Sequence, residues 1–123
     1  DITGFGLIGH AHEMASASGV TIEIDAKRVP LMQRTLDLAR GGTVTRAAKS
    51  NLEHLGDKFA PNGVEEALVN VLADAQTSGG LFLSVSPNRA DALVAALKKR
   101  DSRATDVIGR VVDRSRSTIA LSR

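Results

Sequence analysis

The apolar residues of this 123-residue chain change their spacing several times, from the period of an amphipathic helix to the alternation of a strand. Helical spacing predicts five helices, at about 7–18, 31–40, 46–55, 64–72 and 87–97. Alternating or uninterrupted apolar residues predict four strands, at about 20–24, 81–85, 107–112 and 118–121. Helices and strands in this mixed order predict an α+β, two-layer domain in which one four-stranded mixed sheet is covered by helices.

Two of these strands carry specific expectations. The run Leu81–Val85 is almost entirely apolar, which is typical of a central strand buried on both faces. Ser86 as the N-cap and Pro87 at the first helical position then begin the next helix. The last two strands are expected to form a hairpin through residues 113–117. A mass of 12.9 kDa fits a single domain over residues 1–123.

Composition excludes several classes of protein. The chain has no Cys, so it offers no disulfide, no Cys-ligated zinc and no thiol nucleophile. Three Phe, without Trp or Tyr, argue against an aromatic platform for single-stranded nucleic acid. Charged residues interrupt every apolar run before the roughly 18 residues of a membrane span, and no secretory signal precedes them. We therefore expect a soluble, cytoplasmic protein without membrane or nucleic-acid partners. Because the first residue is Asp1 and not Met, we also expect that the chain has been processed, truncated or cut from something longer.

The first candidate site is the segment Asp1–Gly6, directly before a predicted helix. Backbone N–H groups at a helix start attract phosphate, and glycines allow it to approach closely. A carboxylate just ahead could then hold a Mg²⁺ ion that bridges phosphate oxygens. The alternative is structural, with Thr3 as an N-cap and Gly4 and Gly6 as turn residues.

The second candidate is Gln76–Gly80, a polar loop of small residues that leads into the run at 81–85. Such a loop is suited to an anion-binding nest of backbone amides. The alternative is structural, a well-bonded turn at which two chain segments touch closely.

Neither the histidines nor the basic residues define a site from the sequence alone. His10 and His12 point about 200° apart on a helix and cannot clamp one metal ion, and His54 has no obvious partner. Residues 1–88 hold 7 basic against 10 acidic side chains, whereas residues 89–123 hold 9 against 4. The basic C-terminal third is either a solvated face or a surface for phosphate-bearing ligands.

Taken together, the motifs Asp1–His10 (DITGFGLIGH) with Glu13-Met14, and Gln76–Leu81 (QTSGGL), resemble the C-terminal domain of the selenophosphate synthetase (selenide, water dikinase) family. That family lies within the aminoimidazole ribonucleotide (AIR) synthetase superfamily. The superfamily's purine-synthesis members usually have a further glycine where this chain has Phe5. The chain departs from the pattern at Ala75, where Pro is common, and over Gly41–Asn51, which matches a glycine-rich stretch only loosely and leaves Asn51 without a role.

The resemblance implies an enzyme that converts selenide, ATP and water into selenophosphate, orthophosphate and AMP. It implies that an N-terminal domain, absent from these residues, carries most of the ATP and Mg²⁺ sites and forms a homodimer. For this chain it implies that Asp1 is a Mg²⁺ ligand, and Thr3 and Gly4 are expected beside that site because of their proximity. No catalytic residue is expected here, so the isolated chain should be inactive.

Two alternatives remain open on the sequence. One is another ATP-dependent enzyme of the superfamily, which the upstream sequence would distinguish through a Cys or selenocysteine and a Lys in a glycine-rich segment. The other is a stand-alone interaction module that docks through its basic C-terminal third. Salt-dependent binding to nucleic acid would favour that module.

Overall fold

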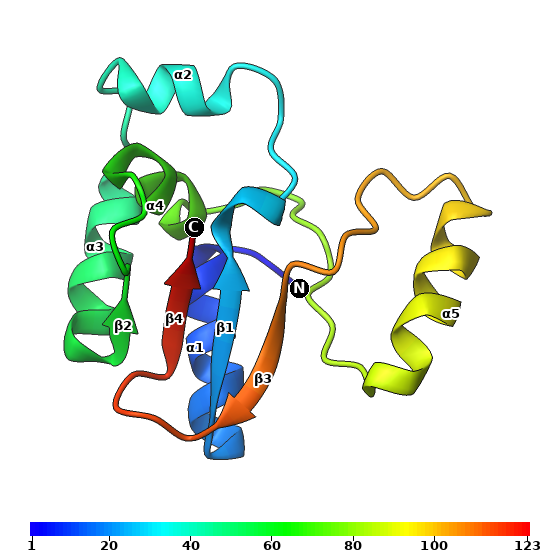
Figure 1. The fold of residues 1–123 in the computed structure, drawn as a ribbon. Helices are drawn as coiled ribbons and strands as arrows, with labels where there is room; N and C mark the ends of the chain where they lie inside the picture. Colours follow the sequence, from blue (N-terminus) through cyan, green and yellow to red (C-terminus); the bar gives the residue numbers. More distant parts are fainter.

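The computed structural model describes all residues from Asp1 to Arg123 and contains five α-helices and a four-stranded sheet (Figure 1). The helices are α1 (Gly6–Ser18), α2 (Thr35–Arg40), α3 (Arg46–Leu55), α4 (Glu66–Ala73) and α5 (Pro87–Lys98). The strands are β1 (Val20–Asp25), β2 (Phe59–Ala60), β3 (Gly109–Asp113) and β4 (Ile119–Ser122). Short 3₁₀ turns follow β1 at Ala26–Arg28 and α3 at Gly56–Lys58. The expected α+β class with a mixed sheet is confirmed.

The sheet is built around β1, which has a partner on each side. The strand order is β2-β4-β1-β3, in which β1 pairs with β4 in parallel and with β3 in antiparallel orientation. Ile22 therefore lies opposite Ile119 on one side and opposite Val111 on the other. Ile22 and Ile24 lie on the same face of β1 and are buried because α1 packs against this strand.

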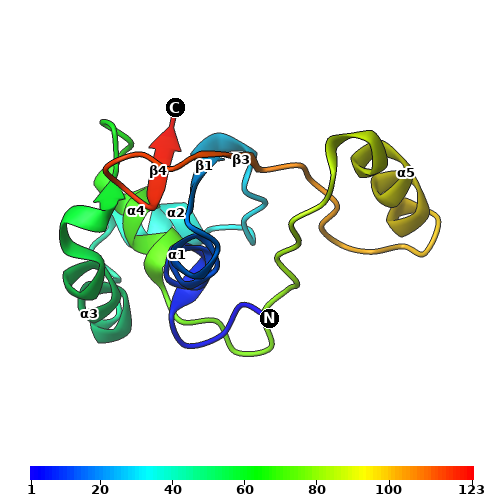
Figure 2. The same ribbon diagram turned by 90° about the horizontal axis from the view of Figure 1, so that it is seen from below.

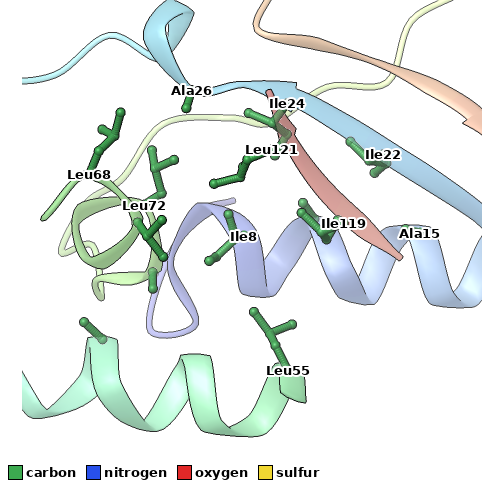
Figure 3. Packing of buried hydrophobic residues seen from close by; sticks show 14 residues of the cluster. Ile8, Ala15, Ile22, Ile24, Ala26, Leu55, Leu68, Leu72, Ile119 and Leu121 are labelled. Atoms are coloured by element: carbon green, nitrogen blue, oxygen red, sulfur yellow. The ribbon is translucent and has the colours of Figure 1, made fainter. Parts of the chain in front are cut away.

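One core joins the sheet to the helices. Figure 2 shows α1 against one face of the sheet, with α3 and α4 beside it. Ile8 and Ala15 of α1, together with Ile24, Leu72 and Ile119, lie in a cluster of 14 buried residues between these elements (Figure 3). Small side chains on α1 allow the helix to approach the strands closely. α1 ends at Gly19, whose φ of 66° is the left-handed conformation typical of a residue just after a helix.

The predicted central strand at Leu81–Val85 is wrong. These residues pair with no strand, and the side chains of Leu81 and Leu83 are 71% and 52% exposed. The fourth strand is instead β2, a pair of residues whose partner is β4. An apolar run indicates a tendency to be buried, but it does not specify a hydrogen-bonding partner, and both edges of β1 are taken by β3 and β4.

The helix after that run also lies outside the core. α5 begins at Pro87 as expected, but none of its residues is buried, and Figure 1 shows it to one side of the sheet and the other helices. The expectation that helices cover the sheet therefore holds for α1 and not for α5. No helix of the structure has the length and apolar character needed to cross a membrane.

The predicted hairpin between the last two strands is also wrong, because β3 and β4 lie on opposite sides of β1. The connection between them passes the start of β1, where the Thr21 hydroxyl donates a 2.6 Å hydrogen bond to the Ser117 carbonyl. The Ser115 amide in turn donates to the Thr21 hydroxyl oxygen. Two helices also begin later than predicted, α2 at Thr35 and α4 at Glu66.

Candidate functional site

The two motif segments, Asp1–Gly6 and Gln76–Gly80, lie side by side although residues 7–75 separate them in the chain. The Ile2 amide donates a 3.0 Å hydrogen bond to the Gly80 carbonyl, and the Gln76 amide donates a 2.9 Å bond to the Thr3 carbonyl. The predicted turn at which two chain segments touch is therefore confirmed. The Gln76–Gly80 loop supports the backbone that carries Asp1.

Glycine is required at two points of this contact because backbones meet there. A β-carbon on Gly79 would overlap the Ile2 carbonyl. A β-carbon on Gly6 would lie 2.6 Å from the Ala73 carbonyl group, and Gly6 also has a positive φ of 65°. By contrast, a β-carbon on Gly4 or Gly80 would meet nothing within 4 Å. The glycines of the motifs therefore serve different purposes, and only some of them allow close packing.

Asn51 of α3 is a part of this site to which the sequence assigned no role. Its side-chain nitrogen donates to the Gly4 carbonyl at 3.0 Å and to the Ala73 carbonyl at 2.8 Å. The sequence signals were its place at the end of the loosely matching stretch Gly41–Asn51 and its position inside a predicted helix, where the helix propensity of Asn is modest. The position of its two acceptors depends on the fold, so the sequence could not identify them.

Asp1, Thr3 and Gly4 are all exposed at this site. The Thr3 hydroxyl lies 3.0 Å from the His10 Nε2 atom, and the other ring nitrogen of His10 lies 3.3 Å from a Glu13 carboxylate oxygen. Thr3 is not the N-cap of α1, because the N-cap is Phe5 and it makes no side-chain capping bond. The capping alternative for Thr3 is therefore wrong, and its hydroxyl instead makes a hydrogen bond with His10.

The carboxylate of Asp1 fits a magnesium site only as one ligand among several. No group of three or more His, Asp or Glu side chains in the structure is arranged to hold a metal ion. Mg²⁺, however, commonly uses one or two carboxylates and completes its shell with water and substrate phosphates. An exposed carboxylate on a backbone that is hydrogen-bonded on both sides of Thr3 is suited to that contribution.

His12 faces a different environment from His10. Its Nδ1 atom lies 2.6 Å from the hydroxyl oxygen of Thr118, which is fully buried. Burial lowers the pKa of His12, and the charge of nearby His54 lowers it further. Both histidines on α1 are therefore engaged with different partners.

Several basic residues of the C-terminal third are engaged within the chain itself. Arg110 pairs with Glu23 at 2.7 Å, and Arg123 donates to the Gly63 carbonyl at 2.8 Å. Arg114 donates to the Val20 carbonyl. These contacts favour the reading of a solvated face that supports β1 and its neighbours over that of a docking surface.

A separate cavity of about 220 Å³ lies between α5, residues 81–85 and β3. Fourteen of its 19 lining residues are hydrophobic, and none belongs to Asp1–Gly6 or Gln76–Gly80. It therefore lies outside the candidate site formed by the two motifs.

Comparison with known proteins gives a consistent result. The family model described as AIR synthase related protein, C-terminal domain, matches residues 1–122. The chain is 40% identical over 119 residues to Selenide, water dikinase 2 of Peptoclostridium acidaminophilum, which is 97% of this chain and 34% of that protein. It is 46% identical over 99 residues to the selenide, water dikinase of Porphyromonas gingivalis, covering 80% of this chain and 28% of that protein. The chain thus spans about a third of the length of the curated relatives it matches.

Proposed function

This chain belongs to the family of AIR synthase related proteins, C-terminal domain, and from that premise we propose that it is the C-terminal domain of a selenide, water dikinase. The observation that carries the proposal is the docking of Asp1–Gly4 on Gln76–Gly80, because it brings together the two motifs that resemble this family. Similarity to relatives with that name extends over nearly the whole chain.

The proposed reaction transfers a phosphoryl group of ATP to selenide, and water accepts another, which gives selenophosphate, orthophosphate and AMP. Phosphoryl transfer depends on positioning and on neutralisation of phosphate charge more than on covalent chemistry by the protein. Mg²⁺ supplies that neutralisation when it is bound. The contribution of this chain is therefore the placement of polar and anionic groups near the phosphates.

Within this chain, Asp1 is proposed as one Mg²⁺ ligand, with Thr3 and Gly4 beside the nucleotide. Asp1 is exposed, and its position is fixed by its neighbour Ile2, which is buried and hydrogen-bonded to Gly80. Gly4 has open space where a side chain would stand, so a bound group can approach the backbone there. The Thr3 hydroxyl, held by His10, provides a polar contact next to both.

The remaining parts of the reaction are assigned to residues outside this chain. An N-terminal domain is proposed to bind most of the ATP and Mg²⁺ and to form the homodimer. The basis is the resemblance to the selenophosphate synthetase family, together with the fact that the chain spans about a third of the length of the relatives it matches. The isolated chain is accordingly expected to show no selenide-dependent ATP turnover.

The proposal is tested by phosphorus NMR of the reaction catalysed by the full-length protein that contains this chain. With Mg²⁺, ATP and selenide under anaerobic conditions, we expect a selenide-dependent phosphorus resonance together with AMP. Asp1→Asn should lower the rate by roughly 10- to 100-fold or more, since even indirect partners of a metal contribute that much. Asp91→Asn removes an exposed carboxylate from α5 and serves as the matched control, with an unchanged rate. ATP consumption without selenide dependence would instead indicate another enzyme of the superfamily.

A further inference from the structure

We infer that Asn51 is a positioning residue for Asp1. Its side-chain amide is hydrogen-bonded both to Gly4, in the segment that carries Asp1, and to Ala73 at the end of α4. These two hydrogen bonds are present in the structure, whereas their consequence for metal binding rests on the proposed function of Asp1. The two parts can be tested separately.

The Asn51 amide group is well matched to its two acceptors. A side-chain NH₂ group has two hydrogens, and here one nitrogen reaches two carbonyls, those of Gly4 and Ala73. Ala73 is the last residue of α4, where carbonyl groups have no partner within the helix. Gly4 lies three residues after Asp1. One side chain thus satisfies a free helix carbonyl and connects it to the candidate site.

Asn51 projects from a helix that is itself firmly held. Thr45 caps α3, since its hydroxyl accepts a bond from the Ala48 amide, and the same hydroxyl donates to the Asp74 carboxylate. Ala48 and Leu55 of α3 are buried in the core. A site is placed more accurately by a side chain on a rigid helix than by one on a loop. Asn51 can therefore transmit the position of α3 and α4 to the Asp1–Gly4 segment.

Besides the bond between Thr3 and His10, three hydrogen bonds hold the segment, two between backbone groups and one from a side chain. The bonds from Ile2 to Gly80 and from Gln76 to Thr3 join backbone to backbone, so they require no particular side chain. The third bond, at Gly4, depends on the Asn51 amide. Without it, the segment keeps these backbone bonds and the close packing of Gly6 against Ala73, but Gly4 loses its hydrogen bond to α3 and, through the same amide, its link to the Ala73 carbonyl. A displacement of about 1 Å at a reacting group can reduce a rate by roughly 100-fold.

Asn62 provides a matched control. Its side-chain nitrogen also donates to a backbone carbonyl, that of Leu121 at 2.9 Å, but none of its bonds involves the motif segments. Asn51→Asp and Asn62→Asp each replace the amide NH₂ donor with a carboxylate oxygen. The side chain keeps its shape, and both substitutions add the same single negative charge. Asp also tolerates the positive φ of 48° at position 62. Asn51→Ala removes the donor without adding a charge, and it must agree with Asn51→Asp.

The experiment uses the full-length protein that contains this chain, and it has two readouts. Hydrogen exchange followed by mass spectrometry reports protection of residues 1–6 and 74–80, and activity titrated with Mg²⁺ gives the half-saturating concentration. For both Asn51 variants we expect exchange in these segments to rise by about tenfold and the half-saturating Mg²⁺ concentration to rise by a similar factor, with a smaller change in kcat. Asn62→Asp should change neither after correction for any difference in Tm.

Any other outcome contradicts a specific part of the proposed role of Asn51. Unchanged exchange in the Asn51 variants would show that Asn51 does not fasten the segment. Faster exchange with an unchanged Mg²⁺ requirement would show a purely structural bond, provided that Asp1→Asn raises that requirement. If Asp1→Asn leaves the requirement unchanged, the proposed role of Asp1 fails and the positioning role fails with it, while exchange still decides whether Asn51 holds the segment.

Discussion

Gly79 lies so close to the carbonyl oxygen of Ile2 that a β-carbon at position 79 would overlap it. The next residue, Gly80, accepts the hydrogen bond of the Ile2 amide at 3.0 Å. Ile2 is itself buried, with 7% of its surface exposed. These contacts join the first residues of the chain to a loop more than 70 residues later, and they determine where the neighbouring Asp1 lies.

Gly79→Ala should separate the two motif segments. The added methyl group meets backbone rather than a flexible side chain, so the chain must shift, at a cost of about 1–3 kcal/mol in the free energy of unfolding. Gly80→Ala, with open space at its β-carbon, should cost clearly less. Urea unfolding of both variants measures the difference. Equal costs would contradict the close approach of Gly79 to Ile2.

Gly6→Ala should destabilise the start of α1. Alanine there would adopt a left-handed conformation and its β-carbon would lie 2.6 Å from the Ala73 carbonyl group. Left-handed backbone alone costs a non-glycine residue about 1–2 kcal/mol, and the overlap adds to it. Gly4→Ala meets neither obstacle and is the control. Thermal unfolding should show a much lower Tm for Gly6→Ala than for Gly4→Ala, and similar Tm values would count against this geometry.

Leu121→Ala and Leu81→Ala should differ strongly. Leu121 in β4 is 1% exposed within the core, and its truncation should cost about 2–5 kcal/mol. Leu81 is 71% exposed, so its truncation should change stability by less than about 0.5 kcal/mol. The free energy of unfolding from denaturant titration measures both. A large loss of unfolding free energy in Leu81→Ala would contradict the exposed position of Leu81 and would support the buried strand that the sequence predicted at 81–85.

Stability should fall as the pH is lowered through the range in which His12 takes up a proton. Burial lowers the pKa of His12 in the folded protein below its ordinary value of 6.5. Below that value the unfolded chain binds the proton more readily than the folded one, so acid favours unfolding. Above about pH 6.5 both states are neutral and the effect vanishes.

The His12→Gln variant isolates this effect from that of the carboxylates, which also titrate in acid. Urea midpoints at about pH 7.5 and 5.5 should differ more for the wild-type protein than for His12→Gln. An equal loss in both proteins would show that the folded state does not disfavour the charged form of His12.

Local patterns were sufficient to predict most of the helices and the first strand. The apolar spacing of α1 and its end at Gly19, the start of α5 at Pro87, and the alternation of β1 all involve residues within a few positions of one another. The two motifs were also evident, because each is a short run of defined residues. Their order and composition were enough to suggest the family.

The tertiary structure alone decided which strands pair and what holds the motifs together. The apolar run at 81–85 has the composition of a strand but pairs with none, while Phe59–Ala60 pairs with β4 as the fourth strand. Asn51 gained its role only when folding brought Gly4 and Ala73 to the same side of α3. Spacing along a chain reports which face of an element is apolar, but hydrogen-bonding partners distant in sequence are selected by the packing of the whole domain.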